Sequence, residues 1–352
     1  MEKFIVPSGL SGQTDGQGSL SRPPTRLENY GNSIFRGAAY CFAWLTVLLV
    51  LYIVGTISIQ AAPAISHHGW GFITGTTWDP NTREYGILPE IWGTMYSSAL
   101  ALIMGSFFGL AVAIFLSEHF LAKAVFSFLK FFGVQFHFLW GRLPDQLENV
   151  LKNLIELLAA IPSVVYGLWG IFYVIPVIRP FCEGLHAKLG WLPIFSTTLS
   201  GPGMLPAAIV LAIMILPTVT AISLNALLAV PPKMREASYG LGATQWETIL
   251  AISLPTASKG IFGSIILAFG RALGETMALA MLVGNSNVIS WSLFSPANTL
   301  AALLANNFAE AGPNDVRILM FAALILLGIT LVVNLIGSVI LDRASMSKQG
   351  VH

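Results

Sequence analysis

Charged residues are scarce in this chain, since Asp, Glu, Lys and Arg make up 10% of its 352 residues. Soluble domains carry about 25% charged residues. Hydrophobic residues make up 55% of the chain, and a soluble protein of this composition would expose a large apolar surface to water. The net charge is only +1. The chain therefore lacks the excess of positive charge that would indicate a nucleic-acid partner. The composition therefore predicts a protein whose solvent is the lipid bilayer.

The sequence also lacks the residue patterns of catalysis. It contains no Gly-x-x-x-x-Gly-Lys-Ser/Thr phosphate loop, so the chain cannot hydrolyse ATP by that route. No pattern of nucleophile and base or of metal ligands stands out, and we predict no catalytic residue, no metal site and no cofactor bound by this chain. The adjacent His67 and His68 are expected to be polar loop residues, because two histidines alone are too few for a metal site.

Six stretches with few or no charges each have the ~20 residues that cross a hydrocarbon core of about 30 Å. They are Gly37–Gly71, with its densest apolar part at Tyr40–Ile59, and Ile91–Ser117, Leu157–Ile178, Met204–Val230, Gly260–Gly284 and Ile318–Leu341. The sequence therefore predicts an all-α membrane protein with six transmembrane helices in residues 36–352. Residues 1–35, rich in Gly, Ser, Pro and Gln, are expected to form a disordered cytoplasmic tail.

The stretch Leu121–Trp140 is apolar and aromatic but carries Lys123, Lys130 and His137. We expect an interfacial amphipathic helix there, and a seventh span is the alternative.

Three further features of the predicted spans have local explanations. Pro162 is expected to kink the third span, because proline removes a helix hydrogen bond. Glu156 is expected in the first turn or two of the same span, where an acid interacts favourably with the helix dipole. Gly105 and Gly109, four residues apart, predict close packing of the second span against another helix.

The distribution of Lys and Arg predicts which side of the membrane each loop occupies, because cytoplasmic loops carry an excess of these residues. One side holds Lys3, Arg22, Arg26, Arg36, Lys123, Lys130, Arg142, Lys152, Lys233, Arg235, Lys259, Arg343 and Lys348. The other side holds only Arg83, Arg179, Lys188 and Arg317. We therefore expect both termini to be cytoplasmic.

The cytoplasmic segment 231–260 predicts two short helices joined by a turn. Pro231 and Pro232 are expected to end the preceding helix, and Pro255 to close the unit. The pieces Lys233–Leu241 and Thr244–Ile252 fit helices on either side of Gly242, which adopts a positive φ at little cost. Thr244 and Glu247, three residues apart, predict a capping box.

This segment carries a recognisable motif, Glu236-Ala237-x₄-Gly242-x₉-Ile252-x-Leu254-Pro255. It resembles the EAA loop of permease subunits of bacterial ATP-binding-cassette (ABC) importers, although Ser238 stands where a second alanine is commoner. The resemblance implies a coupling helix that seats in a groove on a separate ATPase, which uses ATP and Mg²⁺. It also implies that Glu236, Ala237 and Gly242 are the coupling residues.

The predicted fifth span contains two charged residues, Arg271 and Glu275. Arg271 is expected near the middle of the span, where an arginine costs about 2.5–3.5 kcal/mol on insertion scales. Glu275 would then lie one turn further along the same helix face. Gly270 and Gly274 would let another helix approach closely. An arginine fork suits bidentate binding of an oxyanion, whereas an internal ion pair that holds two subunits in register is the structural alternative.

The segments Gly270–Ala278, Gly284-Asn285, Leu154–Gly167 and Tyr85–Thr94 resemble the permeases of phosphate-specific ABC importers, the PstC family. The resemblance covers most of residues 85–340, and residues 121–145 look like an insertion. It implies the type I ABC importer (MetI-like) fold, with its core at about 91–341, in the bacterial plasma membrane. Arg271 and Glu275 would then lie in the substrate pathway.

In that family the permease forms half of a pathway for inorganic phosphate. The implied partners are a PstB-like ATPase, a second, PstA-like permease and a PstS-like phosphate-binding protein, beside membrane lipid. A permease for another oxyanion, such as sulfate or molybdate, is one alternative function. An ATP-independent transporter is a second, which the EAA-like loop disfavours.

Overall fold

The computed structural model describes residues 25–118, 120 and 143–349, in two units that meet between Thr56 and Ile57. Within these residues, six helices are long and apolar enough to cross a membrane, which confirms the predicted number of spans. Their bounds are Asn29–Thr74, Leu88–Ser117, Ser163–Leu189, Met204–Leu228, Gln245–Leu273 and Pro313–Arg343. The predicted interfacial helix at 121–140 lies outside the described residues.

The first span belongs to helix α1 (Arg26–Thr74), which starts inside the predicted tail. The tail prediction is therefore wrong for residues 26–35, because an established helix extends at little cost into neighbouring polar residues. None of the side chains in the apolar window of this span is buried, as expected for a helix surrounded by lipid. Gly69 interrupts α1 with φ 52° and ψ −134°, a conformation that glycine adopts readily.

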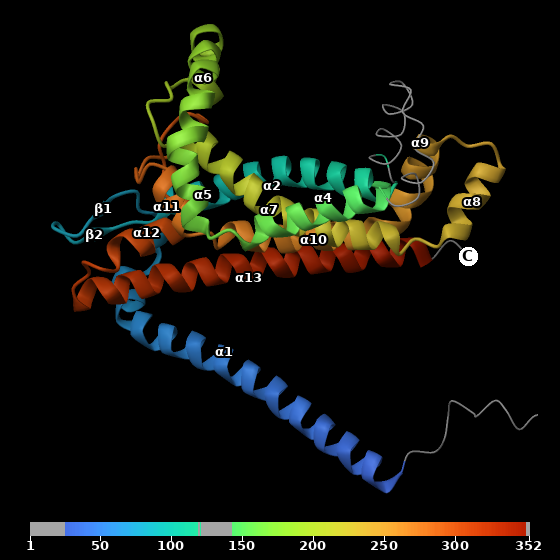
Figure 1. Ribbon diagram of the computed structural model, residues 1–352. Helices are drawn as coiled ribbons and strands as arrows, with labels where there is room; N and C mark the ends of the chain where they lie inside the picture. Colours follow the sequence, from blue (N-terminus) through green and yellow to red (C-terminus); the bar gives the residue numbers. More distant parts are fainter. Residues whose placement is uncertain (1–24, 119, 121–142, 350–352) are drawn as a thin grey trace, which may run out of the picture. The chain divides into compact units, whose positions relative to one another are not determined.

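Four long helices of the second unit run side by side (Figure 1): α2 (Leu88–Ser117), α7 (Met204–Leu228), α10 (Leu254–Leu273) and α13 (Pro313–Gln349). Helix α7 is the most buried span. Gly105 and Gly109 of α2 lie against it, since a Cβ at Gly105 would lie 2.7 Å from Ile215, and one at Gly109 would lie 2.8 Å from Val219. The predicted close packing is confirmed.

The third span starts later than predicted. Helix α4 (Leu143–Ala160) ends before Pro162, and the span itself comprises α5 (Ser163–Trp169), the π-helical turn η1 (Gly170–Val174) and α6 (Ile175–Leu189). Pro162 breaks the helix rather than kinking it, with φ −59° and ψ 140°, because proline also disfavours helical geometry in the residue before it. Glu156 consequently lies near the end of α4, and its placement in the first turn of the span was wrong.

The fifth span is also displaced from the predicted Gly260–Gly284. It begins with α9 (Gln245–Thr248) and continues through the π-helical turn η3 (Ile249–Ser253) into α10, which ends at Leu273. Pro255 does not close the unit as predicted. A π-helical turn precedes it, as η1 precedes Pro176 of α6, and such a widened turn accommodates the missing proline N–H.

An irregular segment, residues 283–299, joins the short helices α11 (Met277–Leu282) and α12 (Leu300–Asn307). Polar backbone groups at membrane depth need partners inside the protein. The N-terminus of α7 supplies some of them, since the N–H groups of Met204 and Leu205 donate to the carbonyls of Ser295 and Leu293 at 3.0 and 2.7 Å. The N–H of Gly203 donates to the carbonyl of Leu282, the last residue of α11, at 2.8 Å. The same bonds satisfy the free N–H groups of the α7 N-terminus.

A hairpin of β1 (Trp78–Asp79) and β2 (Glu84–Tyr85) precedes α2, and a 3₁₀ turn, η2 (Pro193–Phe195), follows α6. The Tyr85 hydroxyl donates to Asp315 Oδ1 of α13 at 2.6 Å. Burial and this hydrogen bond raise the pKa of Tyr85 to about 12. The hairpin is therefore fastened to the start of the last span.

Replacing Tyr85 with Phe is expected to lower the free energy of unfolding by about 1 kcal/mol at pH 8, the usual net contribution of one hydrogen bond. A tyrosine ionises near pH 10 in an unfolded chain. Because its pKa is higher in the fold, the stabilisation is complete below pH ~10 and is lost as pH rises towards 12. Unfolding in detergent at pH 8 and pH 11 measures this difference, with the exposed Tyr52→Phe as control. A pH-independent difference would contradict the assignment.

Candidate functional site

The predicted coupling segment forms a compact unit, defined here as residues Pro232–Thr248. Helix α8 (Pro232–Gly240) is followed by Gly242 with φ +87° and then by α9. The predicted pair of helices and the turn at Gly242 are confirmed. The capping box is confirmed as well, since Thr244 Oγ1 accepts from the Glu247 N–H at 3.4 Å and Glu247 Oε2 accepts from the Thr244 N–H at 2.7 Å.

A buried hydrogen bond holds the two short helices of the coupling unit together. The hydroxyls of Ser238 and Thr248 lie 2.9 Å apart, and both side chains are buried. The N–H of Ala243 donates to the Ser238 carbonyl at 3.2 Å. This contact of Ser238, which departs from the motif, was not predictable from the sequence, because its partner follows ten positions later with no periodicity to indicate the contact.

Replacing Ser238 with Ala is expected to destabilise the coupling unit by about 1–3 kcal/mol, because the Thr248 hydroxyl would stay buried without its partner. Adding Thr248→Val should recover most of the loss, since two matched apolar groups leave no polar atom unsatisfied. Hydrogen exchange of residues 232–248 measures the effect, with the exposed Ser338→Ala as control. A double variant no better than Ser238→Ala would argue against this bond.

The motif residues of the coupling unit face outward. Glu236, Ala237 and Gly242 are all exposed. Large apolar side chains are exposed beside them, namely Met234, Tyr239, Leu241 and Trp246, and Leu241 is 90% exposed. This surface is available to a partner.

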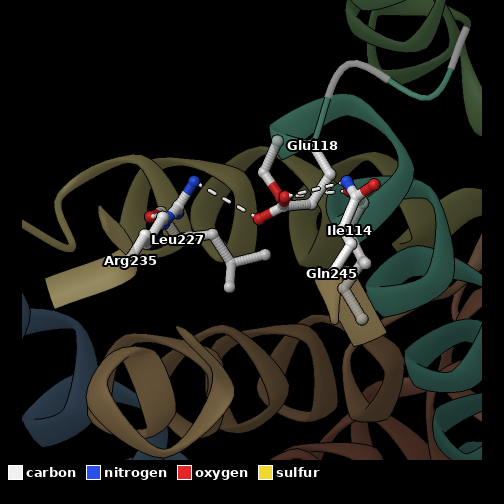
Figure 2. A network of polar contacts seen from close by, with 6 residues as sticks. Ile114, Glu118, Leu227, Arg235 and Gln245 are labelled. Atoms are coloured by element: carbon white, nitrogen blue, oxygen red, sulfur yellow. Dashed lines mark hydrogen bonds and ion pairs between the residues drawn. The ribbon is translucent and has the colours of Figure 1, made fainter. Parts of the chain in front are cut away.

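A polar network joins the coupling unit to the spans (Figure 2). Glu118, directly after α2, pairs through Oε1 with Arg235 Nη1 of α8 at 3.3 Å. Arg235 Nη2 also donates to the Leu227 carbonyl of α7 at 2.7 Å, and Gln245 Nε2 of α9 donates to Glu118 Oε2 at 3.2 Å. Glu118 was not predicted as a site residue, since its one signal in the sequence is an acid directly after an apolar span.

The structure separates Arg271 from Glu275. Arg271 lies in the last turn of α10, which ends at Leu273, whereas Glu275 lies in the irregular connection between α10 and α11. The predicted mid-span position and shared helix face are wrong, because α10 ends at Leu273 with Gly274 as its C-cap residue, and glycine is a weak helix former. Within the described residues, no ion pair joins the two side chains.

Arg271 is exposed, and its Nη1 lies 3.5 Å from Thr218 Oγ1 of α7. A cation in the last turn interacts favourably with the helix dipole, which gives Arg271 a stabilising role at this helix end. Its exposed guanidinium also leaves donors available to an anion.

Of the two glycines expected to admit a neighbouring helix, Gly270 does so. A Cβ there would lie 3.0 Å from the side-chain oxygen of Asn334 in α13. Gly274 instead ends the helix.

Known proteins similar to this chain agree on its family. Residues 138–345 match the family described as "Binding-protein-dependent transport system inner membrane component". The chain belongs to this family. Within the family, it is 35% identical over 321 residues to the phosphate transport system permease protein PstC of Haemophilus influenzae, a match that covers 90% of this chain and 95% of the relative. It is 30% identical to the probable PstC of Methanocaldococcus jannaschii, with 85% and 90% covered.

Solved structures of ABC transporters show the same fold. A bacterial ABC transporter involved in the import of the acidic polysaccharide alginate matches with a TM-score of 0.58 at 14% identity, covering 91% of this chain and 99% of that one. The complex of the alginate transporter with its pentasaccharide-bound periplasmic protein matches with a TM-score of 0.54 at 14% identity, covering 87% and 94%. The predicted fold, a six-helix type I ABC importer permease of the MetI-like kind, is confirmed.

Proposed function

We propose that this chain is the permease subunit of an ATP-driven phosphate importer and forms half of the pathway for inorganic phosphate across the bacterial plasma membrane. The observation that carries the proposal is the similarity to PstC permeases over 90% of the chain. The coupling unit supports the proposal, because its motif residues are exposed on a folded turn that the hydrogen bond between Ser238 and Thr248 stabilises.

The partner that supplies the energy is a separate, PstB-like ATPase that uses ATP and Mg²⁺. It docks on the exposed surface around Glu236, Ala237 and Gly242. A PstA-like permease completes the pathway, and a PstS-like protein delivers phosphate from the outer side. Lys and Arg placement supports cytoplasmic positions for both termini and for the coupling unit.

The proposed substrate pathway contains Arg271 and Glu275. Arg271 offsets the charge of the passing anion with its exposed guanidinium. Glu275 does not orient Arg271 through a shared helix face, since it lies beyond the helix end. Its carboxylate, which can only accept hydrogen bonds, accepts one from the P–OH group of phosphate and disfavours a fully ionised oxyanion such as sulfate.

Replacing Arg271 with Gln tests the pathway. Phosphate uptake is expected to fall at least about tenfold, because a hydrogen bond to a charged group contributes about 1.5–3 kcal/mol. Permease abundance and ATPase co-purification should stay normal. Arg343→Gln, an exposed arginine at the end of the last span, is the matched control. Normal uptake with normal abundance would exclude this role for Arg271.

Competition identifies the anion, and co-purification identifies the energy source. Excess sulfate should leave phosphate uptake unchanged, and uptake of sulfate itself would favour the other-oxyanion alternative.

The intact chain should retain an ATPase during purification from membranes. Uptake without any bound ATPase would favour an ATP-independent transporter.

A further inference from the structure

The acid that follows α2 is not explained by the stability of that helix. Glu118 directly follows the last helical residue, Ser117, and its side chain is 7% exposed. A negative charge at a helix C-terminus opposes the helix dipole, and a buried charge is costly unless it is paired. The hydrogen-bond and ion-pair partners of Glu118 must therefore offset the cost of burying its charge.

The two carboxylate oxygens of Glu118 bind two different helices of the coupling unit. Oε1 pairs with Arg235 of α8 at 3.3 Å, and Oε2 accepts from Gln245 of α9 at 3.2 Å. In Figure 2 these two side chains approach the carboxylate from opposite sides. One side chain therefore holds both short helices on either side of the Gly242 turn.

Arg235 extends this connection to a second span. Its other terminal nitrogen donates to the Leu227 carbonyl at 2.7 Å, in the last turn of α7. The ends of α2 and α7 and both helices of the coupling unit thus meet at four residues, which we name the Glu118 junction: Glu118, Leu227, Arg235 and Gln245.

An aromatic contact joins α2 and α9 independently of the charges. The ring of Phe120 lies 6.2 Å from that of Phe115 in α2 and 5.7 Å from that of Trp246 in α9, stacked on both. Two separate contacts therefore connect the same two helices.

We propose that Glu118 is a positioning residue that fixes the coupling unit to the ends of α2 and α7, so that displacement of the unit moves both spans. This inference rests on the proposed function, in which a partner ATPase displaces the unit. Glu118 differs from Glu236 and Ala237, which are exposed, because its side chain is enclosed by the chain's own residues. It transmits a displacement without touching the ATPase.

The variant Glu118→Gln tests this role, because it removes the charge that Arg235 requires while keeping the side-chain size. The intact importer with its ATPase should still assemble and hydrolyse ATP, but phosphate transported per ATP hydrolysed should fall about tenfold. Hydrogen exchange of residues 232–248 should become about tenfold faster, because the junction no longer holds the unit. Lys259→Gln removes one charge at an exposed position of α10, outside the coupling unit, and should change neither quantity.

A charge exchange, Glu118→Arg with Arg235→Glu, keeps the pair with reversed signs but removes the Arg235 hydrogen bond to the Leu227 carbonyl. It should therefore restore transport per ATP only partly, to within about threefold of wild type. It also serves as the test if Glu118→Gln does not accumulate. Wild-type hydrogen exchange in Glu118→Gln, or loss of ATPase binding without faster exchange, would overturn the proposal. Absence of phosphate uptake in the wild-type importer would instead refute the proposed function, and the exchange measurement would still decide the role of Glu118.

Discussion

A Gly93→Ala permease is expected to be strongly destabilised and to accumulate poorly in the membrane. The added Cβ would lie 1.9 Å from the Asn298 carbonyl oxygen, so one backbone has to move. The Asn298 segment cannot retreat freely, because the Leu300 N–H donates to Thr94 Oγ1 at 2.9 Å and the Ala297 N–H donates to the Val283 carbonyl at 2.9 Å. Overpacking costs about 1–3 kcal/mol, and we expect the upper end of this range or more because the clash is with backbone.

Thermal unfolding of detergent-purified protein, together with membrane abundance, measures this effect. Gly328→Ala in α13 is the matched control, since nothing lies within 4 Å of its added methyl. The control should be neutral or more stable by about 0.5–1 kcal/mol, because alanine favours the helix. Equal unfolding temperatures for the two variants would show that α2 does not approach Asn298 this closely.

A Gly242→Ala importer is expected to transport about tenfold less phosphate while the permease accumulates normally. Gly242 has φ +87°, and an L-residue with a side chain pays about 1–2 kcal/mol in a left-handed conformation. The turn should therefore relax, which would change the angle between α8 and α9 and misplace the surface proposed to bind the ATPase. The fold of the spans should be unaffected, because the turn is exposed.

Gly240→Ala is the matched control for this prediction. Both glycines have open space around an added Cβ, and only Gly242 has a positive φ. Gly240→Ala should keep wild-type uptake, and Gly242→Asn should keep more than Gly242→Ala, because asparagine tolerates left-handed geometry. Uptake and ATPase co-purification are measured for all three. If both alanine variants behave alike, the backbone of Gly242 does not matter for coupling.

Features set by neighbouring residues were predictable from the sequence. Apolar length gave the number of spans, and the spacing of Thr244 and Glu247 gave the capping box. The consequences of proline were not predictable, because they depend on whether the helix can widen. Pro162 breaks a helix, whereas Pro176 and Pro255 each follow a π-helical turn inside a continuous span.

The candidate site residues divide in the same way, into features that neighbouring residues predict and features that depend on the tertiary fold. Arg271 and Glu275 were assigned to one helix face because four residues form about one helical turn, and the early end of α10 at Gly274 removes that premise. Glu118 could not be paired with Arg235 from the sequence, because that contact depends on how α2, α7 and the coupling unit pack. Periodicity identifies faces of a single helix, whereas contacts between helices depend on the tertiary fold.

The continuous helix from Gln245 to Leu273 has a mechanical consequence. Its first turn belongs to the coupling unit and its last turn carries Arg271, so one helix connects the coupling unit to Arg271. Its 29 residues span roughly 40 Å at about 1.5 Å per residue, so a tilt of ~5° about one end shifts the other by roughly 3.5 Å. That distance is comparable to a hydrogen-bond length, so a small rotation at the α9 end would displace the Arg271 guanidinium by about one hydrogen-bond length.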